Sequence, residues 1–230
     1  HFEEKRRLME SLIARDTLNP DWARDLGASW AKLGDLARAE GDVAAARAAH
    51  ERGLAARTPL VVRDTGNMDW ARDLAISWRK LGDAARAAND LAVARASYFQ
   101  GVGIVDRLRA RRPEDPDPAR ELAGLWARIG ETAIAEDSLD SASEAFAQTA
   151  RIVAEWCARE PDSAFWAREA AVAQDCCGDV ALRQGDFILA GDHYRAARDI
   201  RARFAAAEPT PGAWARDLAV SDTKLGDVAL

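Results

Sequence analysis

The stretch that decides the fold is WARDLAISWRKLGDAA, residues 70–85. Closely similar stretches occupy residues 22–37 (WARDLGASWAKLGDLA) and residues 214–229 (WARDLAVSDTKLGDVA). The first begins 48 positions before residue 70, and the last begins 144 positions, or three times 48, after it. A fixed internal period of this length is the sequence signature of a repeat architecture.

Single residue types keep the same step of 48 residues along the chain. Each repeat carries an arginine followed by an acidic residue, and a glycine ten positions after the arginine. These glycines are Gly34, Gly82, Gly130, Gly178 and Gly226. The sequence therefore predicts a single solenoid over residues 1–230, with units at roughly 19–66, 67–114, 115–162 and 163–210 and partial units at 1–18 and 211–230.

Each unit has the apolar pattern of two helices. The first helix carries one stripe of a 3.6-residue helix, formed by Trp22, Leu26, Trp30, Leu33 and Ala37. A break follows at EGD (residues 40–42) and AND (residues 88–90), where Gly or Asn suits a left-handed turn and Asp caps the next helix. The second helix carries Val43, Ala46, His50, Gly53 and Leu60. Its far end has a row of large apolar residues: Leu12, Leu60, Leu108, Trp156 and Phe204.

Residues 29–50, SWAKLGDLARAEGDVAAARAAH, resemble a tetratricopeptide repeat (TPR), whose pattern is Trp-x2-Leu-Gly followed by Ala-x3-aromatic. The matching residues are Trp30, Leu33, Gly34, Ala46 and His50, then Trp78, Leu81, Gly82, Ala94 and Tyr98, then Trp126, Ile129, Gly130, Ala142 and Phe146. The resemblance implies an all-α, right-handed superhelical α-solenoid of antiparallel helix hairpins, with about five repeats of 48 residues.

The chain departs from the family pattern in several places. Gln174 and Cys177 stand where the fourth repeat should have Trp and Leu, and Ala37 stands where tyrosine is usual. The ordinary repeat has about 34 residues, so the longer period is expected to extend both helices by about two turns each. The WARDL lead-in belongs to this extended form and resembles a bacterial subclass of the family.

The repeated glycine has a physical explanation. A glycine inside a helix destabilises it by about 1 kcal/mol relative to alanine. Its return in every repeat predicts that a neighbouring helix passes too close for a methyl group, with alanines such as Ala46 on the facing helix.

Composition narrows the class of protein. Hydrophobic residues make up 48% of the chain, and the formal net charge is −6, from 38 acidic and 32 basic groups. This balance argues against nucleic acid as a partner, and no apolar run is long enough to span a membrane. Three cysteines without a framework spacing indicate a reducing compartment, so a cytoplasmic location is expected.

The sequence offers little for catalysis, so we expect no enzyme, no cofactor and no metal. The histidines His1, His50 and His193 lie far apart, and His50 stands where Tyr98 stands, which favours a packing role. Cys176 and Cys177 are adjacent, a poor spacing for metal binding, and Cys177 is expected to be a small core residue. The glycines of the LGD stretches lie inside a helix and do not form a phosphate loop.

Two charged rows are candidate binding residues. In TPR proteins the residues that match Ala28, Ala31, Asp35 and Arg38 line the concave groove, and Arg24 extends that line. Stacked repeats would place two charged rows about 16 Å apart by helix rise. The arginine row is Arg24, Arg72, Arg120, Arg168 and Arg216, and the carboxylate row is Asp35, Asp83, Glu131, Asp179 and Asp227. The candidate groove residues are Arg24, Asp35, Arg38, Arg72, Asp83, Arg86, Arg120, Glu131, Arg168 and Asp179. The alternative is that each arginine only pairs with an acidic residue of a neighbouring helix, such as Asp73.

Three functions remain open at this point. The first is a protein-interaction scaffold that binds a peptide or partner helix in the groove. The second, implied only by resemblance, is a regulatory or sensor arm of a larger bacterial signalling or defence effector. The third is self-association through terminal repeats without a capping helix, because Phe2 aligns with His50 and the last helix should expose Leu218, Leu225 and Val228.

Overall fold

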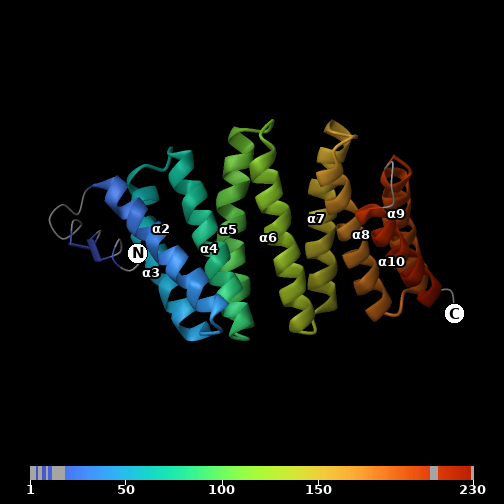
Figure 1. The fold of residues 1–230 in the computed structure, drawn as a ribbon, viewed down its shortest axis with the longest axis horizontal. Helices are drawn as coiled ribbons and strands as arrows, with labels where there is room; N and C mark the ends of the chain where they lie inside the picture. The colour runs from blue at the N-terminus through green and yellow to red at the C-terminus, as the bar shows by residue number, and fades with distance from the viewer. Residues whose placement is uncertain (1–3, 5–6, 9, 12–18, 208–211, 229–230) are drawn as a thin grey trace. The chain divides into compact units, whose positions relative to one another are not determined.

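Helices make up the described structure of the chain. The computed structural model describes residues 4, 7–8, 10–11, 19–207 and 212–228 (Figure 1). The first helices of the repeats are α2 (Pro20–Ala39), α4 (Met68–Ala87), α6 (Pro116–Ala135), α8 (Ala164–Arg183) and α10 (Ala213–Val228). The second helices are α3 (Val43–Arg63), α5 (Leu91–Arg111), α7 (Leu139–Arg159) and α9 (Phe187–Ala207).

The helix boundaries repeat with the period of the sequence. From α2 to α8 the first helices begin at residues 20, 68, 116 and 164, and from α3 to α9 the second helices begin at residues 43, 91, 139 and 187. Both series advance by 48 residues, so the predicted all-α repeat of helix hairpins is confirmed. The first helices begin about two residues earlier than the apolar stripe suggested, because Asn19 and Asn67 cap α2 and α4.

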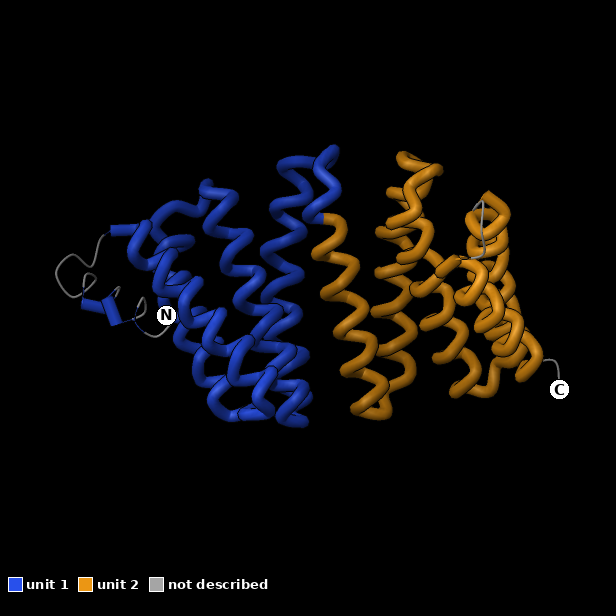
Figure 2. The backbone as a smooth tube through the Cα atoms, viewed as in Figure 1, with its two compact units in different colours: residues 1–118 blue, residues 119–230 orange. Residues whose placement is uncertain are grey.

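The chain forms two compact units, residues 1–118 and 119–230 (Figure 2). In unit 1, α3 packs against both α2 and α4, and α5 packs against α4. In unit 2, α8 packs against both α7 and α9, and α10 packs against α9. The extent of a single solenoid over residues 1–230 remains a prediction.

The turn inside each hairpin has a residue in the left-handed region. These residues are Gly41 (φ 80°), Asn89 (φ 58°), Asp137 (φ 56°) and Gly185 (φ 82°). Gly, Asn and Asp adopt this conformation at the least cost. The aspartates that follow in three of the hairpins, Asp42, Asp90 and Asp186, accept a hydrogen bond from the backbone of the next helix.

The repeated glycine of the first helix contacts a ring rather than a helix backbone. A β-carbon on Gly82 would lie 2.5 Å from Cε1 of Tyr98, and one on Gly34 would lie 2.5 Å from Cε1 of His50. Gly130 and Gly178 meet the rings of Phe146 and Tyr194 in the same way. The predicted close contact is therefore present at these four glycines, and the nearest atoms belong to the aromatic position of the second helix. At Gly226 no such atom lies within 4 Å among the described residues.

The far ends of the second helices are packed by large apolar side chains. Leu60, Leu108 and Trp156 are buried. The ring of Trp156 stacks on Trp166 with centroids 5.4 Å apart, and Phe204 stacks on Trp214 at 4.9 Å. Leu12, the first member of the predicted row, lies outside the described residues.

The expectation for the last helix was wrong. Leu218, Leu225 and Val228 are half-buried rather than exposed. Leu225 and Val228 pack against the cluster of Ala181, Ala190 and Tyr194. Phe2, used in the same argument, lies outside the described residues. Among the helices that the structure describes, none is long and apolar enough to cross a membrane.

Candidate functional site

The arginine row of unit 1 reaches acidic groups of the following repeat. Nε of Arg24 donates to Oδ2 of Asp73 at 2.6 Å, which joins α2 to α4. Nη2 of Arg72 donates to Oδ2 of Asp117 at 2.9 Å. The hydrogen bond to Asp73 raises the pKa of the Arg24 guanidinium. Both pairs are partly exposed, so each contributes about 0–1 kcal/mol.

The arginine row of unit 2 contacts rings as well as carboxylates. The guanidinium of Arg120 lies over the ring of Phe165, 4.6 Å from its centroid. The guanidinium of Arg168 lies 4.8 Å from the ring of Trp214, and its Nε is 3.8 Å from Oδ2 of Asp217. These arginines therefore touch the first helix of the next repeat through cation–π contacts.

The carboxylate row of unit 1 also joins neighbouring helices. Nζ of Lys80 on α4 donates to Oδ2 of Asp35 on α2 at 2.5 Å. The hydroxyl of Tyr98 donates to Oδ1 of Asp83 at 2.8 Å, which joins α5 to α4. Burial, followed by the charge of Asp83, raises the pKa of Tyr98, so the hydroxyl keeps its proton and acts as a donor.

Asp179 in unit 2 repeats this arrangement. It accepts from the hydroxyl of Tyr194 at 2.7 Å and from Nζ of Lys224 at 2.7 Å. In the third repeat Phe146 stands in the column of Tyr98, so Glu131 has no hydroxyl from that position. Arg38 and Arg86, in the last turns of α2 and α4, are exposed.

The predicted rows are therefore placed on the first helices, and most of their members contact the next repeat. This is the geometry of the stacking interpretation, in which the charges join adjacent hairpins. Binding of a ligand by the same residues stays a prediction.

A pocket of about 500 Å³ lies beside the first member of the arginine row. It is lined by Asp21, Arg24, Asp25, Ala28, Arg57 and Asp73. The sequence did not single out Arg57, which lies on α3 with only 7% of its surface exposed. Its Nη1 donates to Oγ of Ser77 at 2.7 Å, while its buried Nε has no hydrogen-bond partner among the described residues. Burial lowers the pKa of this guanidinium.

Arg201 in unit 2 is the repeat equivalent of Arg57. It donates through Nη1 to Oγ of Ser221 at 2.6 Å and through Nη2 to Oδ2 of Asp175 at 2.5 Å. The residue equivalent to Asp175 in the first repeat is Ala31, so Arg57 lacks this carboxylate. The sequence carries a signal for this pair, because arginine at this position occurs together with serine in the following first helix. The repeats have Arg57, Val105, Val153 and Arg201 at the arginine position. They have Ser77, Leu125, Ala173 and Ser221 at the serine position.

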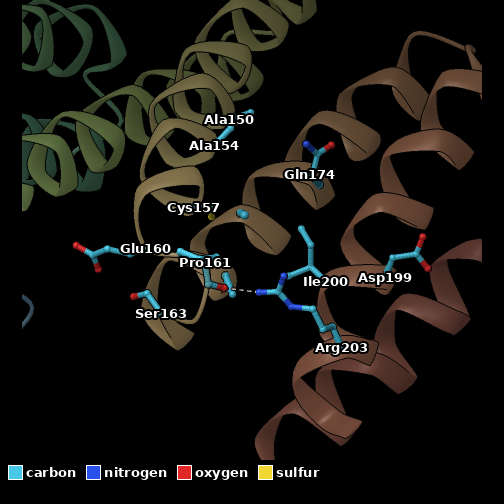
Figure 3. A pocket seen from close by; sticks show the side chains of 12 residues that line it. Ala150, Ala154, Cys157, Glu160, Pro161, Ser163, Gln174, Asp199, Ile200 and Arg203 are labelled. Carbon is cyan, nitrogen blue, oxygen red and sulfur yellow. Dashed lines mark hydrogen bonds between the residues drawn. The ribbon is translucent and has the colours of Figure 1, made fainter. Parts of the chain in front are cut away.

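A second pocket, of about 400 Å³, lies in unit 2 between α7, α8 and α9 (Figure 3). Its walls are mostly small or apolar: Ala150, Ala154, Cys157, Pro161, Ala167, Ala170 and Ile200. Its polar lining residues are Glu160, Ser163, Gln174, Asp199 and Arg203, of which Arg203 donates to the carbonyl of Pro161. Of these residues, only Gln174 drew attention in the sequence.

The remaining titratable candidates lie in packed surroundings. His50 is 3% exposed, and burial lowers its pKa. Cys176 and Cys177 pack against a buried cluster that includes Phe146, and burial raises their thiol pKa values to about 12 and about 11. Within the described residues, no group of three or more His, Cys, Asp or Glu side chains could hold a metal ion.

Comparisons with known proteins bear on the fold. No protein-family model matches the sequence, and no curated protein matches it. Among solved structures, BtubC (BKLC) from P. vanneervenii has a TM-score of 0.68 at 15% identity, over 99% of this chain and 80% of that one. A Podosopora anserina protein with nearly identical TPR-like repeats has a TM-score of 0.60 at 17% identity, over 87% and 86%. MamA has a TM-score of 0.53 at 15% identity, over 89% and 91%. The chain therefore has the fold of the tetratricopeptide-like helical repeat proteins.

Proposed function

We propose that the chain is a protein-interaction scaffold that binds a peptide or partner helix against the first helices of its repeats. The helices α2 and α4 each carry an arginine near the N-terminal end, Arg24 and Arg72, and an aspartate followed by an arginine near the C-terminal end. Such an arrangement suits a partner that carries charged side chains of both signs. The proposed contact residues are those of the two charged rows.

The pocket at Arg24 carries this proposal. It opens beside the row, and it contains a buried guanidinium whose Nε has no hydrogen-bond partner among the described residues. A ligand carboxylate that reached this guanidinium would take the role that Asp175 has for Arg201 and would gain affinity from a charge-assisted hydrogen bond. In unit 2 the equivalent guanidinium already has its acceptor in Asp175.

A displayed random-peptide library tests the proposal. Peptides selected on the full chain are measured by fluorescence anisotropy against wild type and against Arg24→Ala combined with Arg38→Ala. We expect affinity to fall at least about tenfold, which corresponds to about 1.4 kcal/mol. The control is Arg107→Ala, an exposed arginine on α5, which should leave affinity unchanged.

Two results would count against the proposal. One is that no peptide sequence is enriched on the chain. The other is that the groove variant and the Arg107→Ala control bind the selected peptide with the same affinity. Salt dependence adds a separate check, because contacts at partly exposed charges weaken as ionic strength rises.

Self-association is a second candidate function, favoured by one observation. Phe187, Ile188 and Leu189 at the start of α9 are 57%, 79% and 44% exposed. Contiguous exposed apolar side chains are typical of interaction surfaces. Sedimentation of wild type and of Ile188→Glu across a concentration series tests this. A mass that does not change with concentration in wild type would rule it out.

A further inference from the structure

The pocket of unit 2 lies where the third and fourth repeats have smaller or polar side chains in place of large apolar ones. Three of its lining residues are Ala150, Ala170 and Gln174. The residues 96 positions earlier, two repeats back, are Leu54, Leu74 and Trp78. Leucine also stands at the Ala170 position in the first and third repeats, as Leu26 and Leu122, and tryptophan stands at the Gln174 position there, as Trp30 and Trp126.

Unit 1 has larger apolar side chains at the equivalent positions. Its equivalent helices are α3, α4 and α5, and α4 packs against both of the others. Leu74 is buried, and Leu54 and Trp78 are half-buried. The same place between α7, α8 and α9 is a pocket because those side chains are shortened or replaced.

The hydrogen-bonded pair of His193 and Gln174 fills only part of the volume that a tryptophan at residue 174 would take. Nδ1 of His193 lies 2.7 Å from Oε1 of Gln174. His193 takes the position of Ala49, Ser97 and Ala145 in the other repeats, so a larger residue accompanies the loss of tryptophan. A pocket of about 400 Å³ remains, which is within the size range of ligand-binding pockets.

The walls of the pocket suit an aromatic ring. Alanines and Ile200 give apolar contact, and the sulfur of Cys157 adds a polarizable surface that interacts well with rings (Figure 3). Burial raises the pKa of the Cys157 thiol, so it is uncharged at neutral pH. Arg203 also lines the pocket; its guanidinium lies 4.7 Å from the centroid of the Phe204 ring and donates to the carbonyl of Pro161, so its position is fixed.

We propose that this pocket binds a tryptophan side chain of a partner protein, whose ring takes the space that Trp78 occupies in unit 1. The protein's own repeat identifies the occupant, because Leu and Trp side chains fill the equivalent space. The pocket uses a different stripe of α8 from the one that carries Arg168 and Asp179. The inference is therefore independent of the charged groove residues and of the function proposed for them.

The probe for this proposal is N-acetyl-L-tryptophanamide, which presents the side chain with a peptide bond on each side. Its binding to the full chain is followed by saturation-transfer NMR and by the shift in thermal unfolding. The matched variant combines Ala170→Leu, Gln174→Trp and His193→Ala, which are residues found at these positions in other repeats. We expect wild type to bind and to be stabilised by the probe, and the filled variant to lose at least about tenfold in affinity.

A single substitution keeps the test informative should the triple variant fail to fold. Ala150→Leu restores only the residue found as Leu54 and should also weaken binding. Equal binding by wild type and by a folded filled variant would overturn the proposal, as would no binding to wild type. Free indole is the second probe, and binding of indole without binding of N-acetyl-L-tryptophanamide would overturn the assignment to a partner side chain.

Discussion

The ring of Tyr98 covers Gly82 so closely that a β-carbon at residue 82 would lie 2.5 Å from Cε1 of the ring. The hydroxyl of the same ring donates to Asp83, the next residue on α4. One side chain of the second helix thus fixes both the spacing and the register of its hairpin. Tyr194 makes the same pair of contacts with Gly178 and Asp179.

The contact predicts that residue 82 tolerates no larger side chain. Gly82→Leu should lower the free energy of unfolding by about 1–3 kcal/mol or more, because Tyr98 must leave its position. Ala87→Leu is the matched control, since Ala87 lies exposed in the last turn of the same helix. Urea unfolding of the two variants measures the difference, and equal midpoints would refute the contact.

The second prediction concerns acid stability. Burial lowers the pKa of His50 below its ordinary value of 6.5, so the unfolded chain binds a proton more readily there than the folded chain. This histidine therefore contributes stability above pH 6.5 that is lost as the pH falls through the folded-state pKa.

His50→Tyr should remove that loss. The new hydroxyl should reach Asp35 as Tyr98 reaches Asp83, so stability should rise by about 1–2 kcal/mol. His193, whose pKa is also lowered by burial, keeps part of the acid sensitivity in this variant. Chemical unfolding at pH 7.5 and pH 5.5 checks the result, and a stability difference between the two pH values as large as that of wild type would contradict it.

The third prediction concerns the buried pair of Arg57 and Ser77. The second repeat has Val105 at the arginine position, and the third has Leu125 at the serine position. The double change Arg57→Val with Ser77→Leu should therefore fold and be neutral or more stable by about 1–4 kcal/mol, since no charge is left buried. Ser77→Leu alone should destabilise, because Nη1 of the buried Arg57 loses the hydroxyl of Ser77 and keeps only the longer hydrogen bond to the carbonyl of Asp73. Thermal unfolding of both variants is the measurement, and a single variant as stable as the double one would be the contrary result.

The fourth prediction separates the two interpretations of the arginine row. Arg72→Ala combined with Arg120→Ala removes one partly exposed ion pair and the cation–π contacts of Arg120 with Phe165 and Trp166, so stability should fall by only about 1–2 kcal/mol. If the row binds ligand, affinity for a selected peptide should fall at least about tenfold. Calorimetry with and without the peptide gives both quantities. A loss of stability with unchanged affinity would leave the row as a contact between repeats only.

The sequence predicted the fold well because its signals are repeated. The period of 48 residues and the turn residues Gly41, Asn89 and Gly185 locate both helices of each hairpin. The glycine column correctly indicated a close contact. It did not identify the contacting atoms, because a period does not say which side chain of the facing helix turns toward the glycine.

The candidate pockets depend on departures from the repeat, and these are weaker signals. Gln174 was visible as a missing tryptophan, but Ala170 is an ordinary residue in a chain rich in alanine. Arg57 was missed because an arginine on a helix is usually exposed. The co-occurrence of Arg57 with Ser77 and of Arg201 with Ser221 is a sequence signal for the pair, and the structure adds that Arg57 is buried and donates to Ser77.

Binding of a peptide against the first helices is tested by measuring amide hydrogen exchange of the chain with and without a library-selected peptide. We expect the peptide to slow exchange in α2 and α4, around Arg24, Asp35 and Asp83, and to leave α3 and α5 unchanged. Slower exchange confined to α3 and α5, with none in α2 and α4, would contradict it.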